Sequence, residues 1–116
     1  QIEAQARRLL ATAHGHDATG ELFRQLFEYE ELETRLKDPT LFPDYEATRA
    51  DMTQELRRFV EDVMFGTGSD AKLRTLLTAS HTVANARIGK LYGATIGGTG
   101  WQKLTTRPEE RAGVLT

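Results

Sequence analysis

The fold is decided by residues 76–93, which read LLTASHTVANARIGKLYG. An apolar helical stripe ends in this stretch, a polar turn follows at Ser80 and His81, and Thr82 is placed to cap a second helix that Gly93 ends. This alternation of apolar helical stripes with polar turn and capping residues predicts short helices joined by tight turns.

The segments before this stretch have the same helical period. Apolar residues fall on one face of residues 1–14, which Gly15 is expected to end, and on a wider face of residues 22–32. Two prolines exclude a regular helix from residues 37–43, and Asp44 is expected to cap the longest helix. We expect the core to contain the inward positions of these stripes, namely Leu9, Leu22, Leu26, Phe27, Leu56, Phe59, Leu73, Leu77, Ile88 and Leu91.

The remainder of the chain, residues 94–116, has a glycine tract and neither a helical nor an alternating period. Trp101 is expected either to pin this tail to the core or to stay half exposed as a recognition anchor. Residues after Leu104 are expected to lie extended along the surface. The sequence therefore predicts an all-α bundle of four to five helices over residues 1–93, with an irregular Gly-rich C-terminal tail at 94–116.

Length and composition limit the classes of function. A chain of 116 residues fits a single domain, and a first residue that is Gln rather than Met suggests a module excised from a longer protein. The formal charge of -2 argues against a nucleic-acid partner, and no apolar run is long enough for membrane insertion. The chain contains 0 cysteines, which excludes disulfides, thiolate metal sites and the cysteine attachment of c-type haem within it.

One cluster of potential metal ligands lies in residues 14–17, which read His-Gly-His-Asp. The imidazoles and the carboxylate would need a further ligand to make an ordinary site. The same residues serve as a helix C-terminus, a glycine stop and an aspartate cap. We interpret them as structural and predict no metal, no cofactor and no catalytic residue.

Three further residues are candidates for interaction with a partner. His81 and Asn85 are four residues apart at the expected start of a helix, where their side chains would meet, but without an orienting acid they do not indicate a nucleophilic site. Arg111 has a planar set of donors suited to a carboxylate of residues 28–33 or of a neighbour. Together with Trp101, these are the interaction candidates that the sequence offers.

Several segments resemble a family of uncharacterised domains, the domain-of-unknown-function family 1592. The resemblance lies in residues 78–93 and 111–116, in the opening helix at residues 4–10, and in the Met-Glu-Phe spacing of residues 52–59. It implies a setting in large exported proteins of planctomycetes, myxobacteria and some marine bacteria, often with c-type cytochrome domains in the same chain. The implied location is periplasmic or extracellular, and the family has no activity to carry over.

Two classes of function remain after these observations. The first is a non-catalytic helical module that spaces or docks neighbouring domains of the parent chain, or binds a protein partner. The second is part of an enzyme whose active site is shared with adjacent modules, in which His81, Asn85 and Arg111 would be the first residues to test. The absence of a recognisable catalytic constellation favours the first class.

Overall fold

The computed structural model describes residues 1–114 of the chain. Within them the fold is mostly helical, with one small antiparallel sheet. The prediction of a mostly helical fold is confirmed. The described residues form six helices rather than the expected four to five, together with a two-stranded sheet that the all-α prediction did not include. In chain order the elements are α1 (Ile2–Leu10), α2 (Ala13–Leu26), α3 (Glu30–Thr34), α4 (Tyr45–Phe65), α5 (Leu73–Thr78), β1 (His81–Ala84), α6 (Ala86–Leu91) and β2 (Gln102–Thr105).

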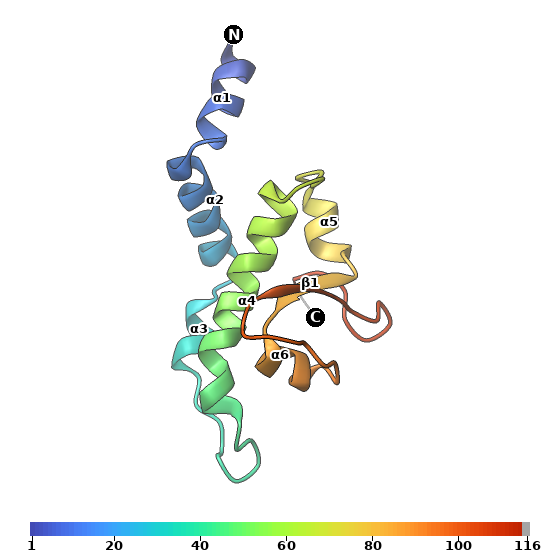
Figure 1. The fold of residues 1–116 in the computed structure, drawn as a ribbon. Helices are drawn as coiled ribbons and strands as arrows, with labels where there is room; N and C mark the ends of the chain where they lie inside the picture. Colours follow the sequence, from blue (N-terminus) through green and yellow to red (C-terminus); the bar gives the residue numbers. More distant parts are fainter. Residues whose placement is uncertain (115–116) are drawn as a thin grey trace.

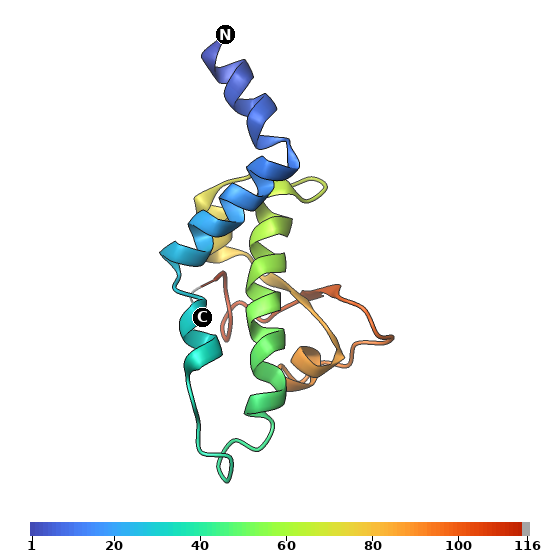
Figure 2. The same cartoon turned by 90° about the vertical axis from the view of Figure 1, so that its left-hand side faces the viewer.

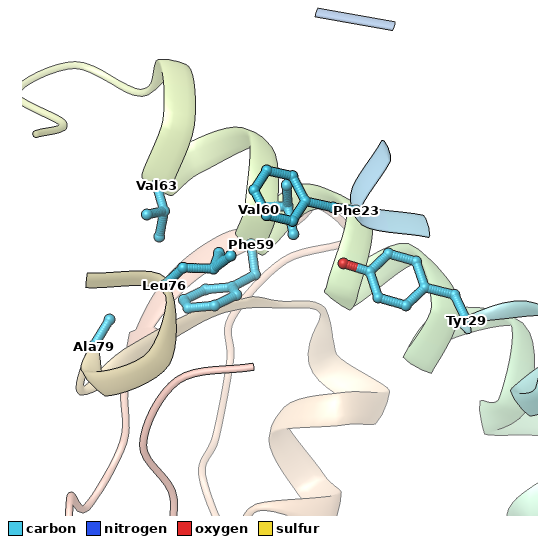
Figure 3. Close-up of a cluster of buried hydrophobic side chains, with 7 residues drawn as sticks. All are labelled: Phe23, Tyr29, Phe59, Val60, Val63, Leu76 and Ala79. Carbon is cyan, nitrogen blue, oxygen red and sulfur yellow. The ribbon is translucent and has the colours of Figure 1, made fainter. Parts of the chain in front are cut away.

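Helix α4 is the element around which the others are arranged. It runs through the middle of the molecule, with α2 and α3 on one side and α5, α6 and the sheet on the other (Figures 1 and 2). Its inward residues recur at the helical period, so one face meets the core along its whole length. The buried cluster built on this face consists of Phe23, Tyr29, Phe59, Val60, Val63, Leu76 and Ala79 (Figure 3).

The sheet joins the segment after α5 to the C-terminal tail. β1 pairs antiparallel with β2, from His81 opposite Thr105 to Ala84 opposite Gln102. Alternate residues of β1 are buried, because successive side chains of a strand point to opposite faces. The predicted turn at residues 80–81 and the predicted irregular structure at 102–105 are therefore both wrong, since each segment supplies the other's hydrogen-bonding partner.

The start of α6 also differs from the prediction. The side-chain Oδ1 of Asn85 accepts hydrogen bonds from the backbone N–H groups of Arg87 and Ile88, at 3.1 and 2.9 Å. This is the bonding pattern of an N-cap, and it satisfies two donors that have no partner within the helix. Asn85 rather than Thr82 therefore caps the helix, and Thr82 lies in the strand.

The junction of α1 and α2 lies four residues earlier than the expected stop at Gly15. Thr12 caps α2, with its Oγ1 accepting from the N–H of Gly15 at 3.1 Å. Gly15 lies inside α2, where a Cβ atom would fall 2.3 Å from the carbonyl oxygen of Leu9. A glycine is needed here so that α2 can approach the end of α1 closely.

The N-terminal arm, which we define as α1 and α2, leaves much of its apolar surface uncovered. In Figure 1 α1 extends beyond the rest of the molecule, and the molecule including α1 measures 58 × 27 × 27 Å. α1 has no buried residue, and α2 buries only Phe23. Phe59 and Ile88 are buried and Phe27 and Leu56 partly so, but the predicted core positions Leu9, Leu22, Leu26, Leu73, Leu77 and Leu91 are exposed.

The tail is held to the fold by backbone hydrogen bonds beyond β2. The N–H groups of Gly113 and Val114 donate to the carbonyl oxygens of Ala79 and Leu76, at 2.8 and 3.0 Å. Gly113 has a φ of 67° and lies so close to α5 that a Cβ atom would fall 2.2 Å from the carbonyl of Leu77. The expected loose surface tail is thus anchored up to residue 114, and residues 115–116 lie outside the described part.

Candidate functional site

A cleft of about 570 Å³ lies between the α2–α3 corner, α4, α6 and the tail. We call it the Glu55 cleft, after the buried carboxylate in its wall. Its apolar wall includes Phe27, Met52 and Phe59, and its polar groups come from segments far apart in the chain. The polar lining residues include Glu28, Glu31, Arg35, Glu55, Tyr92 and Arg111.

Glu55 projects from the buried side of α4 and is only 7% exposed. Its Oε1 accepts a hydrogen bond from the Thr82 hydroxyl at 2.7 Å, and its Oε2 accepts one from the Tyr92 hydroxyl at 2.8 Å. Burial raises the pKa of Glu55 above its usual range, although these two hydrogen bonds and the charge of Arg111 oppose the rise. The carboxylate therefore ties α4 to β1 and α6, and it has a perturbed proton affinity.

Arg111 brings the C-terminal tail to the same cleft. The central carbon of its guanidinium group lies 4.0 Å from the centroid of the Tyr92 ring, a cation–π arrangement. Burial and the neighbouring carboxylate of Glu55 raise the pKa of the Tyr92 hydroxyl. Tyr92 therefore remains a hydrogen-bond donor at neutral pH, between a carboxylate on one side and a guanidinium on the other.

His81 lines one edge of the cleft and belongs to a second polar group. Its Nε2 lies 2.9 Å from Oδ2 of Asp62, and the Nζ atom of Lys103 on β2 lies 2.8 Å from the same oxygen. Partial burial would raise the pKa of Asp62, but its bonds to Lys103 and His81 prevail and lower it. The His81 ring also meets the edge of Phe59, with the centroids 5.7 Å apart.

Of the four interaction candidates predicted from the sequence, two line the Glu55 cleft and two lie elsewhere. His81 and Arg111 line the same cleft, which no spacing in the sequence indicates. Asn85 is used as the cap of α6, away from that wall. Trp101 is half-buried, with the guanidinium of Arg58 5.0 Å from its ring centroid.

Sequence reasoning missed the residues at the centre of the cleft. The sequence marks Glu55 only through the Met-Glu-Phe spacing of residues 52–59, and it does not mark Tyr92 as a polar site residue. A carboxylate on the apolar face of a helix is the signal that was available, because such a group needs hydrogen-bond donors from other segments. The donors themselves, Thr82 and Tyr92, were not identifiable, since they lie 27 and 37 residues away.

The histidines of residues 14–17 lie within α2 and are not brought to a ligand cluster. The ring of His16 stacks on Phe65, with centroids 3.7 Å apart. Over residues 1–114, no group of three or more His, Cys, Asp or Glu side chains is placed to hold a metal ion. His16 therefore contributes to the contact between α2 and α4.

The comparison with known families agrees with the resemblance seen in the sequence. A family model described as protein of unknown function (DUF1592) matches residues 1–94. The chain belongs to the DUF1592 family. The DUF1592 match contains Glu55, Thr82 and Tyr92, whereas β2 and Arg111 lie beyond it.

No curated protein and no solved structure matches this DUF1592 chain. A membrane-crossing helix is also absent from the described part of the chain, where none is both long and apolar enough. Family membership thus brings no named activity, and any functional argument has to come from the geometry.

Proposed function

We propose that this DUF1592 domain is a non-catalytic helical module that docks a neighbouring domain of an exported multidomain protein through its N-terminal arm. The observation that supports the proposal is the apolar surface left uncovered on α1 and α2. Ile2 is 88% exposed, and Leu9, Leu10, Leu22 and Leu26 are each more than half exposed. Apolar residues gathered on one segment in this way mark an interaction surface more often than single exposed leucines do.

A partner that covered this surface would bury apolar side chains that now face water. Complete burial of one Leu or Ile side chain is worth about 1.5–3 kcal/mol. In α1 these side chains follow a helical spacing, with Ile2, Ala6 and Leu9 on one stripe, so the arm already has the pattern of a buried helix. A helix with this pattern is suited to packing against another helix.

The partner is best described as an amphipathic helix of an adjacent domain, possessing an apolar seam and an acidic flank. α1 contains Glu3, Arg7 and Arg8, and the pair between Glu3 and Arg7 at 2.9 Å uses one of the two positive charges. Within the described residues, the Arg8 side chain donates only to the neutral side chain of Gln5, at 2.9 Å. An acidic residue on the partner would therefore meet an uncompensated guanidinium.

The test is hydrogen exchange on the natural protein that contains this domain, compared with the 116-residue chain alone. Docking predicts that amides of residues 2–26 exchange at least about tenfold more slowly in the longer protein, which corresponds to about 1.4 kcal/mol. Leu9→Asp together with Leu10→Asp should remove that protection, because a charge on the seam opposes burial.

The matched control is Leu41→Asp, which changes a leucine that is 72% exposed in the loop before α4, remote from the arm. It should leave the protection of residues 2–26 unchanged. Equal exchange of the arm in both forms of the protein would contradict the docking role.

A second candidate function is favoured by the meeting of His81 and Arg111 in the Glu55 cleft. In this alternative the domain supplies part of an active site that a neighbouring module completes. A structure of the domain together with that module distinguishes the two functions. Polar side chains of the neighbour facing Glu55 across the cleft would support the shared active site. A neighbour that contacts only α1 and α2 would support docking.

A further inference from the structure

The charged groups of the Glu55 cleft are not balanced. Three carboxylates line it, from Glu28, Glu31 and Glu55, against two guanidinium groups, from Arg35 and Arg111. Arg35 is bound to Glu31, with Nη2 2.6 Å from Oε2. Among the lining residues of the described part of the chain, three negative charges minus two positive ones leave a deficit of one positive charge.

The second polar group at the edge of the cleft does not correct this deficit. Asp62 is matched by Lys103, and His81 bonds to the same carboxylate. With a neutral imidazole, this group has no net charge. The wall around Glu55 therefore keeps its excess of one negative charge.

Glu55 also has capacity for further hydrogen bonds. An ionised carboxylate offers about four acceptor positions. In the described structure one position on Oε1 is used by Thr82 and one on Oε2 by Tyr92. A buried carboxylate with unused positions is stabilised by a charged donor more strongly than by a neutral one.

The rest of the wall favours an apolar ligand body. Phe27, Met52, Leu56, Phe59 and Leu91 all line the cleft. The faces of aromatic rings attract cations as well as apolar groups. A volume of about 570 Å³ lies within the range of small-molecule sites, which is roughly 300–1,000 Å³.

We propose that the Glu55 cleft binds a small organic cation, a primary amine attached to an apolar body. The ammonium group would donate to the open acceptor positions of Glu55 and supply the missing positive charge. The apolar body would lie against Phe27 and Phe59. This site is separate from the N-terminal arm, so it does not depend on the docking role.

The test uses phenethylamine as the probe and amide NMR of the 116-residue chain as the measurement. At about pH 8 a histidine is ordinarily neutral while a primary amine is charged. Phenethylamine should shift the amide signals of Thr82 and Tyr92 in a saturable way. Phenethyl alcohol, which has the same body without the charge, should bind at least about tenfold more weakly.

Two substitutions of cleft carboxylates, one buried and one exposed, test the role of the negative charge. Glu55→Gln should weaken phenethylamine at least about tenfold, whereas Glu61→Gln, an exposed position on the same helix, should leave its affinity unchanged. If Glu55→Gln does not fold, the exposed Glu28→Gln at the mouth of the cleft decides, with an expected loss of about two- to threefold from the removed charge. Equal affinity for amine and alcohol, no saturation by about 10 mM amine, or no effect of either cleft substitution would overturn the proposal.

Discussion

Helix α4 and the N-terminal arm have the same kind of amphipathic pattern but opposite environments. In α4 the inward positions Phe59, Val60 and Val63 are each at most 3% exposed. In the arm, Leu9 and Leu22, placed on equally regular stripes, are 56% and 61% exposed. A stripe shows that a helix has a face to bury, and it does not show which surface covers that face.

The difference arises from the number of neighbours each helix finds within the chain. α4 is contacted by α2, α3, α5, α6 and β1, which surround it (Figures 1 and 2). α1 packs mainly against α2, and α2 in turn packs against α4. Stability of this domain is therefore expected to come from the α4 side, and recognition from the arm.

The largest effect is expected from Phe59→Ala. Loss of this buried ring should reduce the free energy of unfolding by about 3–5 kcal/mol, because it leaves a cavity in the buried cluster that Phe59 shares with Val63 and Leu76. Phe42→Ala is the matched control, since Phe42 is 50% exposed, and its loss should cost less than about 1 kcal/mol. Urea unfolding measures both, and similar losses would contradict the assignment of α4 as the core helix.

Gly113→Ala should have the next largest effect, about 1–3 kcal/mol by urea unfolding. The new Cβ would meet the carbonyl of Leu77, and the positive φ would be strained. The amide proton of Gly113, which is bonded to the carbonyl oxygen of Ala79, should then exchange rapidly with solvent. Gly97→Ala is the control, because an added Cβ there has no atom within 4 Å, and a loss as large as that at Gly113 would show that the tail is not anchored at α5.

Glu55→Gln should change how stability depends on pH. The pKa of Glu55 is higher in the folded chain than in the unfolded chain, so the native carboxyl holds its proton more tightly. Wild-type stability should therefore fall as pH rises from the ordinary glutamate value, about 4.3, through the raised value, and then level off. Relative to the variant, the free energy of unfolding of the wild type should fall over this range in urea unfolding, and parallel curves would contradict the perturbed carboxyl.

The smallest effect is expected in the arm. Leu9→Ala and Leu10→Ala should each change the free energy of unfolding of the isolated chain by less than about 0.5 kcal/mol, because both side chains are already more than half exposed. Thermal or urea unfolding provides the measurement. A loss above about 2 kcal/mol would mean that α1 is buried in solution, which would remove the contrast with α4.

The sequence predicted the helices and their apolar faces, because these depend on residues three or four positions apart. The spacing of Leu56 and Phe59 located the inward face of α4. Asp44 is the residue before its start as expected, although its side chain makes no capping hydrogen bond. The same reasoning assigned Leu22 and Leu26 to the core, because a periodic pattern gives the face of a helix without its partner.

What the sequence could not predict depends on pairing between distant segments. β1 has only four residues, and its ladder is completed by β2 some twenty residues later, so neither segment has a recognisable period of its own. The cleft was missed for the same reason. Glu55 and Arg111 approach each other only after α6 and the tail have both folded back onto α4.

The position of the tail has a consequence for the order of events during synthesis. Arg111 and the backbone bonds of Gly113 and Val114 complete the Glu55 cleft, yet these residues leave the ribosome after α4, β1 and α6. At about 5–20 residues per second, α6 precedes them by a few seconds. In that interval the nascent chain exposes the apolar wall of the cleft and, until β2 emerges, the unpaired edge of β1, and surfaces of both kinds make a folding chain prone to aggregate.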